Sequence, residues 1–543
     1  MALERQAPFD PEEASSLGLE AFDEQIVDMK PNVSARKKKM LVGLEAELQR
    51  RLAAERDPRV KQDLEIILTE IRNSIRGIEL SDRYSLPYVS VPRVVFAGLQ
   101  TLLDDQVAPK RRPAALVRLR RYAGLEKGYK PLTVLAEERI RERMKVKGIL
   151  GPPKIQVEKD LQNIPLLLDG IEQLFKKYNL TGYEQAYAKL KEQVEAYNDF
   201  VRREVLPRSR DDFRLPPELY AYRLKSYGVD IPAEELTAMA HKAFDEIQQE
   251  MQRVAADVAK QRGFSSSDYR DVIRELKKEQ LAGDTIVDHY RARIGQIEEI
   301  LRREQLVSLP ERPARMRLAS PAESAAQPAP HMRPPRLINN EGETGEFVLP
   351  LSNPSAQGKR MDDFTFAAAS WTLTAHEARP GHEMQFSAMV ENGVSTARAI
   401  YAFNSTNVEG WGLYSEWMMY PFMPAEGKLI SLQYRLLRAA RAFLDPELHV
   451  GKVTPSQAMD VLTKDVVLSE AMATQEVDRY TFRSPAQATS YFYGYTRLLE
   501  LRRDSEKRLG PKFNQREFHD FILSQGLLPP ALLRKAVEEK FRP

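Results

Sequence analysis

The sequence predicts a mainly α-helical fold. Long segments carry apolar residues at spacings of three and four, the pattern of helices with one buried face. Strand-like character is confined to 336–351, where RLINNEGETGEFVLPL has two short apolar runs around a turn with two glycines. Hydrophobic residues make up 42% of the 543 residues and charged residues 29%, the balance of a globular protein. We therefore expect a helical fold with a small antiparallel β element near 336–351.

The expected helices lie on both sides of a proline-rich segment. Residues 310–335 contain seven prolines among small and basic residues, which predicts a linker or an extended surface segment. We accordingly divide the chain into an N-terminal extension (1–34), a helical half (35–309), this connecting segment (310–335) and a second half (336–543), and expect both halves to form one unit. Helices are expected at 35–56, 58–77, 165–177, 183–205, 233–262, 286–304, 427–444, 455–475, 487–509 and 530–541.

Three pairs of a capping residue and a proline predict helix starts. Thr454-Pro455, Ser484-Pro485 and Asp445-Pro446 each place a hydrogen-bonding side chain directly before a proline. Proline is favoured in the first turn of a helix because its missing N–H would have no partner there.

Composition excludes several classes of function. Lys and Arg total 81 against 78 for Asp and Glu, so charge gives no reason to expect a nucleic-acid partner. The chain has no cysteine, which rules out disulfides, a cysteine nucleophile and thiolate ligands, so any metal must be held by His, Asp or Glu. The sequence contains no apolar run of about 20 residues, so we expect no membrane span. The N-terminus, MALERQAPFDPEE, lacks an apolar signal core, so we expect a cytoplasmic protein, or an exported one whose signal has been removed. The oligomeric state stays open.

The segment 374–385, TAHEARPGHEMQ, carries the most chemistry. It contains His376-Glu377 and His382-Glu383, the residue types with which zinc hydrolases hold the metal and activate water. Six residues on a straight helix separate the histidines by about 120° around the axis and about 9 Å along it. Pro380 and Gly381 lie between them and would allow a bend. The residues alone leave two interpretations open, a metal site with a bent backbone or an ordinary polar helix end.

A third ligand is expected among the carboxylates of 407–416, NVEGWGLYSE. Glu409 and Glu416 are seven residues apart, on nearly the same face of a helix, among large apolar side chains such as Trp411. A carboxylate in such surroundings must be paired, protonated or bound to a metal. The alternative is a core helix in which the glutamate is satisfied by protein groups.

Five motifs in order resemble one family. HEARPGH, EGWGLYSE, RAARAFLDPELH, PAQATSYFYGYTRLLELR and KFNQREFHDFILSQGLLP are similar to the domain of unknown function 885 family, from about Tyr220 to the C-terminus and more weakly from about Leu44. That family is zincin-like, related to helical peptidases such as carboxypeptidase Taq, neurolysin and angiotensin-converting enzyme. The resemblance implies a zincin-like helical metallopeptidase with a deep central cleft.

The resemblance also implies roles for individual residues. His376, His382 and Glu409 would hold one Zn²⁺ per chain, and Glu377 would act as general base. Many members of the family have a second histidine directly after the PGH motif, where this chain has Glu383. That difference leaves the three ligands intact and bears on substrate preference.

Further residues are expected around the reacting bond. The oxyanion donor is expected to be Tyr491, or else Tyr495 four residues on; the alternative for both is aromatic core packing. His449, Arg379 and Arg438 are candidate substrate-binding residues, with structural or salt-bridged roles as alternatives. Asp445 is a candidate partner that orients a ligand imidazole. The remaining histidines are interpreted as surface or structural: His241, His289, His331 and His519.

The sequence thus favours a zinc-dependent peptidase acting on short peptides, with metal-activated water and Glu377 as base. A zinc hydrolase of a non-peptide amide and a non-catalytic helical scaffold that binds peptides stay open, although the intact Glu377 argues against the scaffold. The strand expected at 345–351 would offer its edge to an extended peptide. The substrate, exo or endo cleavage and the identity of the divalent ion are not predicted.

Overall fold

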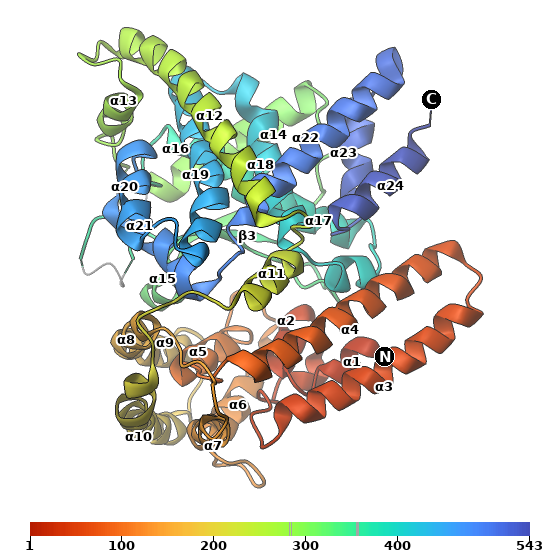
Figure 1. Cartoon of the computed structure of the whole chain (residues 1–543), viewed down its shortest axis with the longest axis vertical. Coiled ribbons are helices and arrows are strands. Elements are labelled where there is room, and N and C mark those ends of the chain that lie inside the picture. The colour runs from red at the N-terminus through yellow and green to blue at the C-terminus, as the bar shows by residue number, and fades with distance from the viewer. Residues whose placement is uncertain (282, 284, 354–357, 543) are drawn as a thin grey trace. The chain divides into compact units, whose positions relative to one another are not determined.

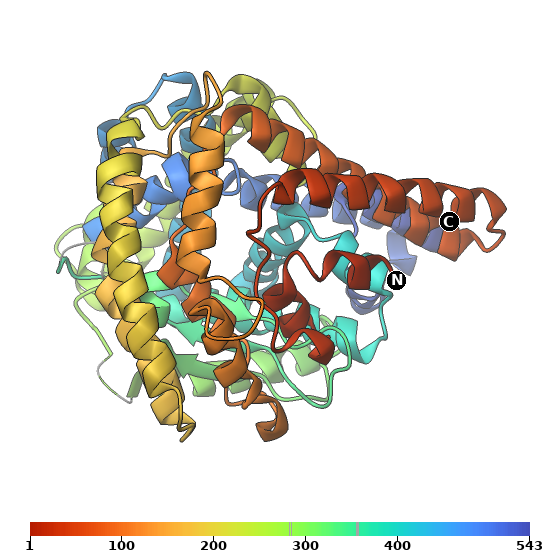
Figure 2. The ribbon, with the colours of Figure 1, turned by 90° about the horizontal axis from the view of Figure 1, so that it is seen from below.

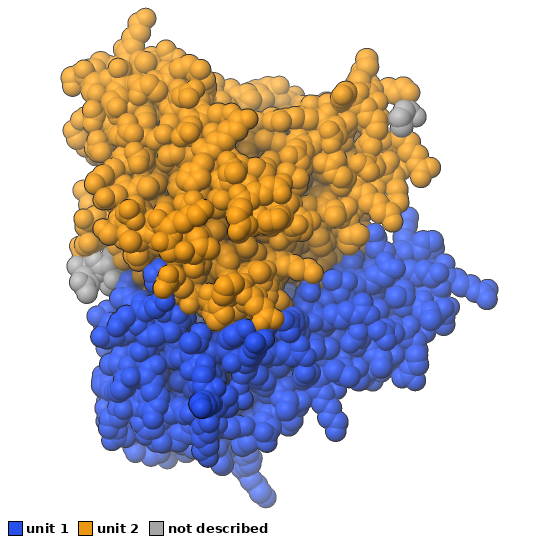
Figure 3. Space-filling view, viewed as in Figure 1, with its two compact units in different colours: residues 1–213, 321–326, 336–343 blue, residues 214–320, 327–335, 344–543 orange. Residues whose placement is uncertain are grey.

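The computed structural model describes residues 1–281, 283, 285–353 and 358–542. These residues are mainly helical with one small sheet, which confirms the predicted fold class (Figure 1). The chain forms two compact units, one of residues 1–213, 321–326 and 336–343 and the other of residues 214–320, 327–335 and 344–543 (Figure 3). The main division therefore follows residue 213, whereas the sequence suggested a division within 310–335.

The first unit is built entirely of helices around its own apolar core. Its two longest helices, α3 and α4, are joined by residues 55–57 and lie side by side (Figure 2). Asp57 begins α4 by accepting hydrogen bonds from the backbone N–H groups of Arg59 and Val60. Residues such as Leu99 and Ile171 are fully buried in the core. The helices of this unit are α1 (Ala2–Gln6), α2 (Pro11–Leu17), α3 (Val33–Ala54), α4 (Pro58–Tyr84), α5 (Val91–Gln100), α6 (Ala114–Tyr122), α7 (Leu132–Met144), α8 (Lys154–Gln162), α9 (Ile164–Lys177), α10 (Glu184–Phe200) and α15 (Pro321–Ala326).

The second unit contains the segments with candidate chemistry. Its centre is α18, which is buried on nearly every side and packs against α22, while α19 packs against α12, α16 and α22. The helices of this unit are α11 (Pro217–Ser226), α12 (Ala233–Arg262), α13 (Tyr269–Leu276), α14 (Thr285–Arg303), α16 (Ala369–Leu373), α17 (His382–Glu391), α18 (Ser405–Met419), α19 (Ala425–Val450), α20 (Pro455–Asp460), α21 (Glu470–Asp478), α22 (Thr489–Leu509), α23 (Gln515–Ser524) and α24 (Pro530–Lys540). No helix in the described part of the chain is both long and apolar enough to span a bilayer.

The sheet has three short strands in the order β1-β3-β2. Strand β3 (Glu346–Leu349) pairs in parallel with β1 (Arg315–Leu318) and antiparallel with β2 (His331–Arg333). β3 lies within the predicted 336–351, but both partners come from the proline-rich segment. Because β3 is the middle strand and is paired on both sides, the idea that residues 345–351 offer a free edge to a peptide is wrong.

The expected helix starts have different outcomes. Thr454 caps α20, with Gln457 completing a reciprocal capping box, which confirms that prediction. Ser484 does not begin a helix, since α22 starts at Thr489.

Asp445-Pro446 lies inside α19 and does not begin a helix. The Asp445 carboxylate instead accepts hydrogen bonds from the Tyr220 hydroxyl at 2.8 Å and the Ala486 N–H at 3.0 Å. Pro446 lacks the N–H of a helix hydrogen bond, yet the buried surroundings of α19 maintain the helix through it. Tertiary contacts therefore override the local signal.

Candidate metal centre

The backbone breaks between the two histidines of the motif. His376 lies in the π-helical turn Thr374–Ala378 that follows α16, and His382 is the first residue of α17. Between them Arg379 is extended, with φ −124° and ψ 133°, and the Arg379-Pro380 peptide is cis. The two imidazole rings consequently lie 4.6 Å apart between centroids, at 81° to each other. The bend expected from Pro380 and Gly381 is present where the sequence placed it.

Two glycines make room for this arrangement. A Cβ atom at Gly381 would lie 1.9 Å from the His376 carbonyl oxygen, so the chain can fold back this closely only without a side chain. A Cβ atom at Gly412 of α18 would lie 2.7 Å from Cε1 of His376 and 2.9 Å from Cε1 of His382. The bare backbone of α18 therefore forms one wall of the space that holds both rings.

Three side-chain atoms converge at this point. Oε2 of Glu409, on α18, lies 3.6 Å from Nε2 of His376 and 3.3 Å from Nε2 of His382, and all three ligand atoms lie within 4.8 Å of one another. Nitrogen and oxygen ligands about 2.0–2.1 Å from a tetrahedral zinc ion lie about 3.3 Å from one another. Oε2 of Glu409 is buried and has no hydrogen-bond partner among the described residues. Spacing and donor types thus fit a divalent cation bound by a His₂Glu set.

Glu409 is in the charge state that a ligand needs. Burial alone would raise the pKa of its carboxyl group, but the neighbouring imidazoles of His376 and His382 outweigh burial and hold the pKa well below its ordinary value. Its other oxygen, Oε1, lies 3.4 Å from the amide nitrogen of Gln487. The side chain is thus a carboxylate with one oxygen directed at the imidazoles.

Glu416, two turns further along α18, orients His376. Its Oε1 lies 2.8 Å from Nδ1 of His376, and its Oε2 accepts a 2.6 Å hydrogen bond from the Thr372 hydroxyl. Burial raises the pKa of Glu416, but Arg438, His376 and Thr372 together lower it below its ordinary value. A carboxylate here fixes the proton on Nδ1 and leaves the Nε2 lone pair for a metal. The sequence suggested Asp445 for this role, whereas the structure assigns it to Glu416.

Glu377 directly follows His376 in the chain and interacts electrostatically with His382 and Glu409. The residue is buried, and its Oε2 has no hydrogen-bond partner in the part of the chain that the structure describes. Burial raises the pKa of Glu377 to about 7, with His382 opposing the shift and Glu409 adding to it. A carboxyl group that titrates near neutrality can both accept and return a proton.

The two candidate tyrosines have different surroundings. The ring of Tyr491 lies nearly parallel to the His376 imidazole, with centroids 6.1 Å apart and 13° between the planes. Its hydroxyl oxygen accepts a 2.8 Å hydrogen bond from Arg479. Tyr495, one turn further along α22, has the guanidinium of Arg435 5.7 Å from its ring centre. The structure therefore brings Tyr491 to the histidines and packs Tyr495 against Arg435.

Arg379 holds the loop between His376 and His382 in place. Its guanidinium donates to Glu383 at 2.9 Å, to Glu298 of α14 at 2.5 Å and to the carbonyl oxygen of Arg312. Glu383 also accepts a 2.7 Å hydrogen bond from the Ser387 hydroxyl. Arg379 and Glu383 are nearly inaccessible. This placement favours a structural role for Arg379 over contact with a substrate.

Arg438 and His449 also differ in what they offer. Nη2 of Arg438 lies 3.5 Å from Glu416 Oε1, its guanidinium carbon lies 5.6 Å from the Tyr491 ring centre, and its Nε is buried without a partner among the described residues. His449 has both ring nitrogens engaged, Nδ1 by the Leu215 N–H at 3.2 Å and Nε2 by the Tyr480 carbonyl at 2.9 Å. Arg438 therefore lies beside the site, and His449 is held by backbone groups.

His519 is a core histidine. It is fully buried, with Nε2 2.8 Å from the Tyr414 hydroxyl and Nδ1 2.7 Å from the Leu306 carbonyl oxygen. Burial lowers its pKa to about 3, so the folded protein keeps it neutral at ordinary pH. Its role is structural, as the sequence predicted for this histidine.

Comparison with known proteins gives a family but no activity. A family model described as a bacterial protein of unknown function (DUF885) matches residues 11–537, so the chain belongs to that family. No curated protein matches the chain.

Two solved structures share the fold over nearly the whole chain. A proposed lipoprotein of unknown function from Shewanella oneidensis is 20% identical, with 98% of this chain and 97% of that chain covered and a TM-score of 0.71. A proposed lipoprotein from Colwellia psychrerythraea is 17% identical, with 99% and 97% covered and a TM-score of 0.75. A proposed oligoendopeptidase F from Bacillus anthracis is 11% identical, with 94% and 92% covered; its TM-score of 0.31 is too low to support an argument.

Proposed function

We propose that this member of the family is a zinc-dependent peptidase. The observation that carries the proposal is the convergence of His376, His382 and Glu409, in which the Glu409 oxygen lies 3.6 and 3.3 Å from the two imidazole nitrogens, close to tetrahedral ligand spacing. Zinc bound by those three residues would supply a Lewis acid for the scissile carbonyl and lower the pKa of water. Glu416 would keep His376 in the tautomer that binds metal.

Glu377 would carry the proton. The carboxylate takes a proton from water as the water oxygen bonds to the carbonyl carbon, and returns it to the amine nitrogen as the C–N bond breaks. Its buried position and a pKa of about 7 suit both transfers. The products are one carboxylic acid and one amine, so atoms and protons balance.

Tyr491 would stabilise the oxyanion. Its oxygen already accepts a hydrogen bond from Arg479, so its own O–H is left to donate. A donor directed at the developing negative charge lowers the barrier more than it stabilises the bound substrate. Arg438, whose Nε is buried without a partner among the described residues, would receive a negative group of a short peptide.

Export is a further part of the proposal. Two structural neighbours are described as proposed lipoproteins, which supports a location outside the cytoplasm. Fractionation of cells that express the native gene would test it, and recovery only in the cytoplasmic fraction would refute it.

Metal analysis together with Glu377→Gln tests the function. Purified protein reconstituted with zinc should hold one equivalent and hydrolyse members of a short-peptide library. Glu377→Gln should keep the zinc and lose at least about 100-fold in rate, because the proton acceptor is removed while the ligands stay. Glu470→Gln, an exposed substitution on α21, is the matched control.

Each outcome tests a separate part of the proposed function. Absence of stoichiometric zinc refutes the metal centre, and unchanged hydrolysis by Glu377→Gln refutes the assigned base. If the protein hydrolyses small non-peptide amides but no library peptide, the function is that of an amidase and not of a peptidase.

A further inference from the structure

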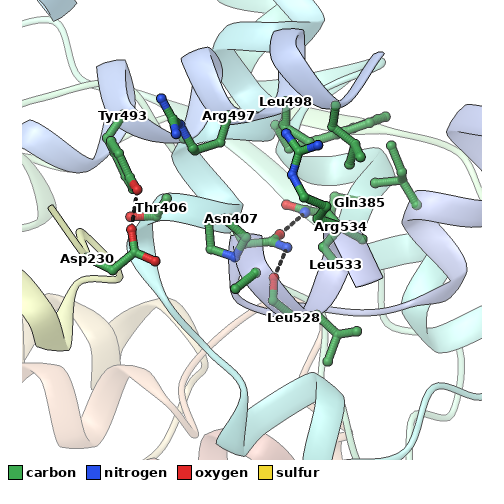
Figure 4. Close-up of a pocket in the computed structure, with 16 residues that line it drawn as sticks. Asp230, Gln385, Thr406, Asn407, Tyr493, Arg497, Leu498, Leu528, Leu533 and Arg534 are labelled. Carbon is green, nitrogen blue, oxygen red and sulfur yellow. Dashed lines mark hydrogen bonds between the residues drawn. The ribbon is translucent and has the colours of Figure 1, made fainter. Parts of the chain in front are cut away.

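A cavity lies on the opposite side of α18 from the candidate metal centre. It has a volume of about 200 Å³ and is bounded by α17, α18, α22, α23 and α24 (Figure 4). Asn407 and Trp411 of α18 line it, whereas Glu409 belongs to the metal centre. Two residues correspond to about 200° around a helix, so Asn407 and Glu409 point to opposite sides. The cavity is therefore distinct from the proposed catalytic site.

Most of the cavity wall is apolar. Apolar cavities of about 150 Å³ bind benzene, so a cavity of this size can hold one ring or one branched alkyl group. Its large apolar side chains are buried and come from four helices and one connecting segment: Trp411, Leu498, Leu501, Ile522, Leu528 and Leu533.

One buried acceptor in this wall lacks a hydrogen-bond partner among the described residues. The Leu528 carbonyl can only accept, so the Asn407 amide must present its NH₂ group there, at 2.7 Å. The Asn407 oxygen then accepts from Nε2 of Gln385, at 2.9 Å, as the dashed lines of Figure 4 show. These two hydrogen bonds fix the orientation of the Gln385 amide. They leave its Oε1 as an acceptor that is buried and has no partner among the described residues. Gln385 itself is only 3% exposed.

Donors lie at the rim. Arg497 binds Glu500 at 2.9 Å through Nη2, but its Nε is buried and has no partner within the described residues. Arg534 lies on α24 at the rim and pairs with Asp504 at 2.6 Å. The lining thus offers N–H donors from two guanidinium groups, opposite in character to the acceptor of Gln385, and it also includes Asp230, whose carboxylate accepts a hydrogen bond from the Tyr493 hydroxyl.

We propose that this cavity binds a small apolar carboxylic acid that also carries an N–H or O–H group. The apolar body fills the space beside Trp411, the N–H or O–H group donates to Oε1 of Gln385, and the carboxylate lies at Arg497. Apolar amino acids and the corresponding 2-hydroxy acids share this chemistry. The site is independent of the proposed peptidase activity.

The cavity and the candidate metal centre are both formed by α17 and α18. Gln385 lies on α17, which begins at His382, and the indole N–H of Trp411 donates to the Pro380 carbonyl at 2.9 Å. A ligand there would contact both helices that present metal ligands. Its binding should therefore raise the unfolding temperature of the protein.

Calorimetric titration and thermal unfolding test the proposal. The probes are L-phenylalanine, L-leucine and 2-hydroxy-3-phenylpropanoate, with 3-phenylpropanoate lacking the donor and glycine lacking the apolar body. At least one of the first three should bind with one equivalent and raise the unfolding temperature. The same acid without the donor should bind at least about tenfold more weakly, since Oε1 of Gln385 then loses its partner.

Variants locate the ligand. Gln385→Leu and Arg497→Ala should each weaken binding at least about tenfold, and Ala531→Trp at the exposed rim should abolish it by covering the mouth. Arg503→Ala, an exposed substitution on α22 outside the cavity lining, is the matched control. Circular dichroism verifies that each variant is folded.

Any of the following results would overturn the proposal: no probe binds at millimolar concentration; binding survives all three cavity variants; or 3-phenylpropanoate binds as well as its hydroxy analogue. The titrations are repeated in chelator, so failure of the zinc proposal leaves this test intact. Binding that disappears with the metal would place the ligand at the metal centre instead.

Discussion

Gly412→Ala should separate metal binding from folding. The added methyl carbon would lie 2.7 Å from Cε1 of His376 and 2.9 Å from Cε1 of His382. Carbon atoms in ordinary contact are about 3.5–4.0 Å apart, so each ring must move by about 0.6–0.8 Å or more. Metal–ligand distances tolerate only about 0.2 Å. The substitution therefore displaces two of the three proposed ligands beyond that tolerance.

The expected loss in zinc affinity is about 100-fold, equivalent to about 2.8 kcal/mol. The figure is the upper end of the 10–100-fold range for losing one orienting partner, because two rings move here. The fold should survive, since alanine gains about 0.5–1 kcal/mol over glycine in a helix and the crowding costs about 1–3 kcal/mol.

The assay is competition for zinc against a chromophoric chelator, with urea unfolding measured in parallel. Gly295→Ala, in α14, is the matched control because its Cβ meets nothing within 4 Å. It should leave zinc affinity unchanged and raise stability by about 0.5–1 kcal/mol. Wild-type zinc affinity in a folded Gly412→Ala protein would refute the proposed ligand geometry.

Three further predictions address other parts of the second unit. Glu416→Gln should weaken zinc binding about 10–100-fold in the same competition assay, because His376 loses its orienting carboxylate; an unchanged affinity contradicts that role. Tyr491→Phe should lower kcat about 100- to 1000-fold while Tyr495→Phe changes it little, and equal effects in steady-state kinetics would refute the assignment of the donor. His519 has a folded pKa of about 3 against about 6.5 when unfolded, so its stabilisation is complete above pH 6.5 and is lost as pH falls toward 3. This group should make the protein about 2 kcal/mol less stable at pH 5 than at pH 7 in urea unfolding, and a pH dependence unaltered by His519→Gln would exclude it.

Local signals in the sequence were enough for much of the fold. Helices such as α12 and α19 show apolar periodicity over many turns, and the cap at Thr454 lies next to the backbone groups it binds. The break before His382 follows from the chemistry of Pro380 and Gly381 themselves. These features depend on residues adjacent in the chain, which is why the sequence shows them.

Features that depend on distant residues were not predicted. Glu416 and His376 are 40 residues apart, so the sequence showed a buried carboxylate without its partner. Asp445 looked like a cap because its partners Tyr220 and Ala486 are remote in the chain. The strands β1 and β2 lie in a segment too rich in proline to show alternation, and they form because β3 pairs with both.

The network around Arg379 has a thermodynamic consequence. Glu383, Glu298 and the carbonyl of Arg312 hold the loop between the histidines through contacts that involve no metal. The site is therefore preorganised, and an ion would enter a protein that is already folded, unlike small zinc domains whose folding requires the metal. Zinc would then add stability only through mass action, by about 1.4 kcal/mol for each tenfold excess over Kd. Loss and re-entry of the ion should be reversible without unfolding.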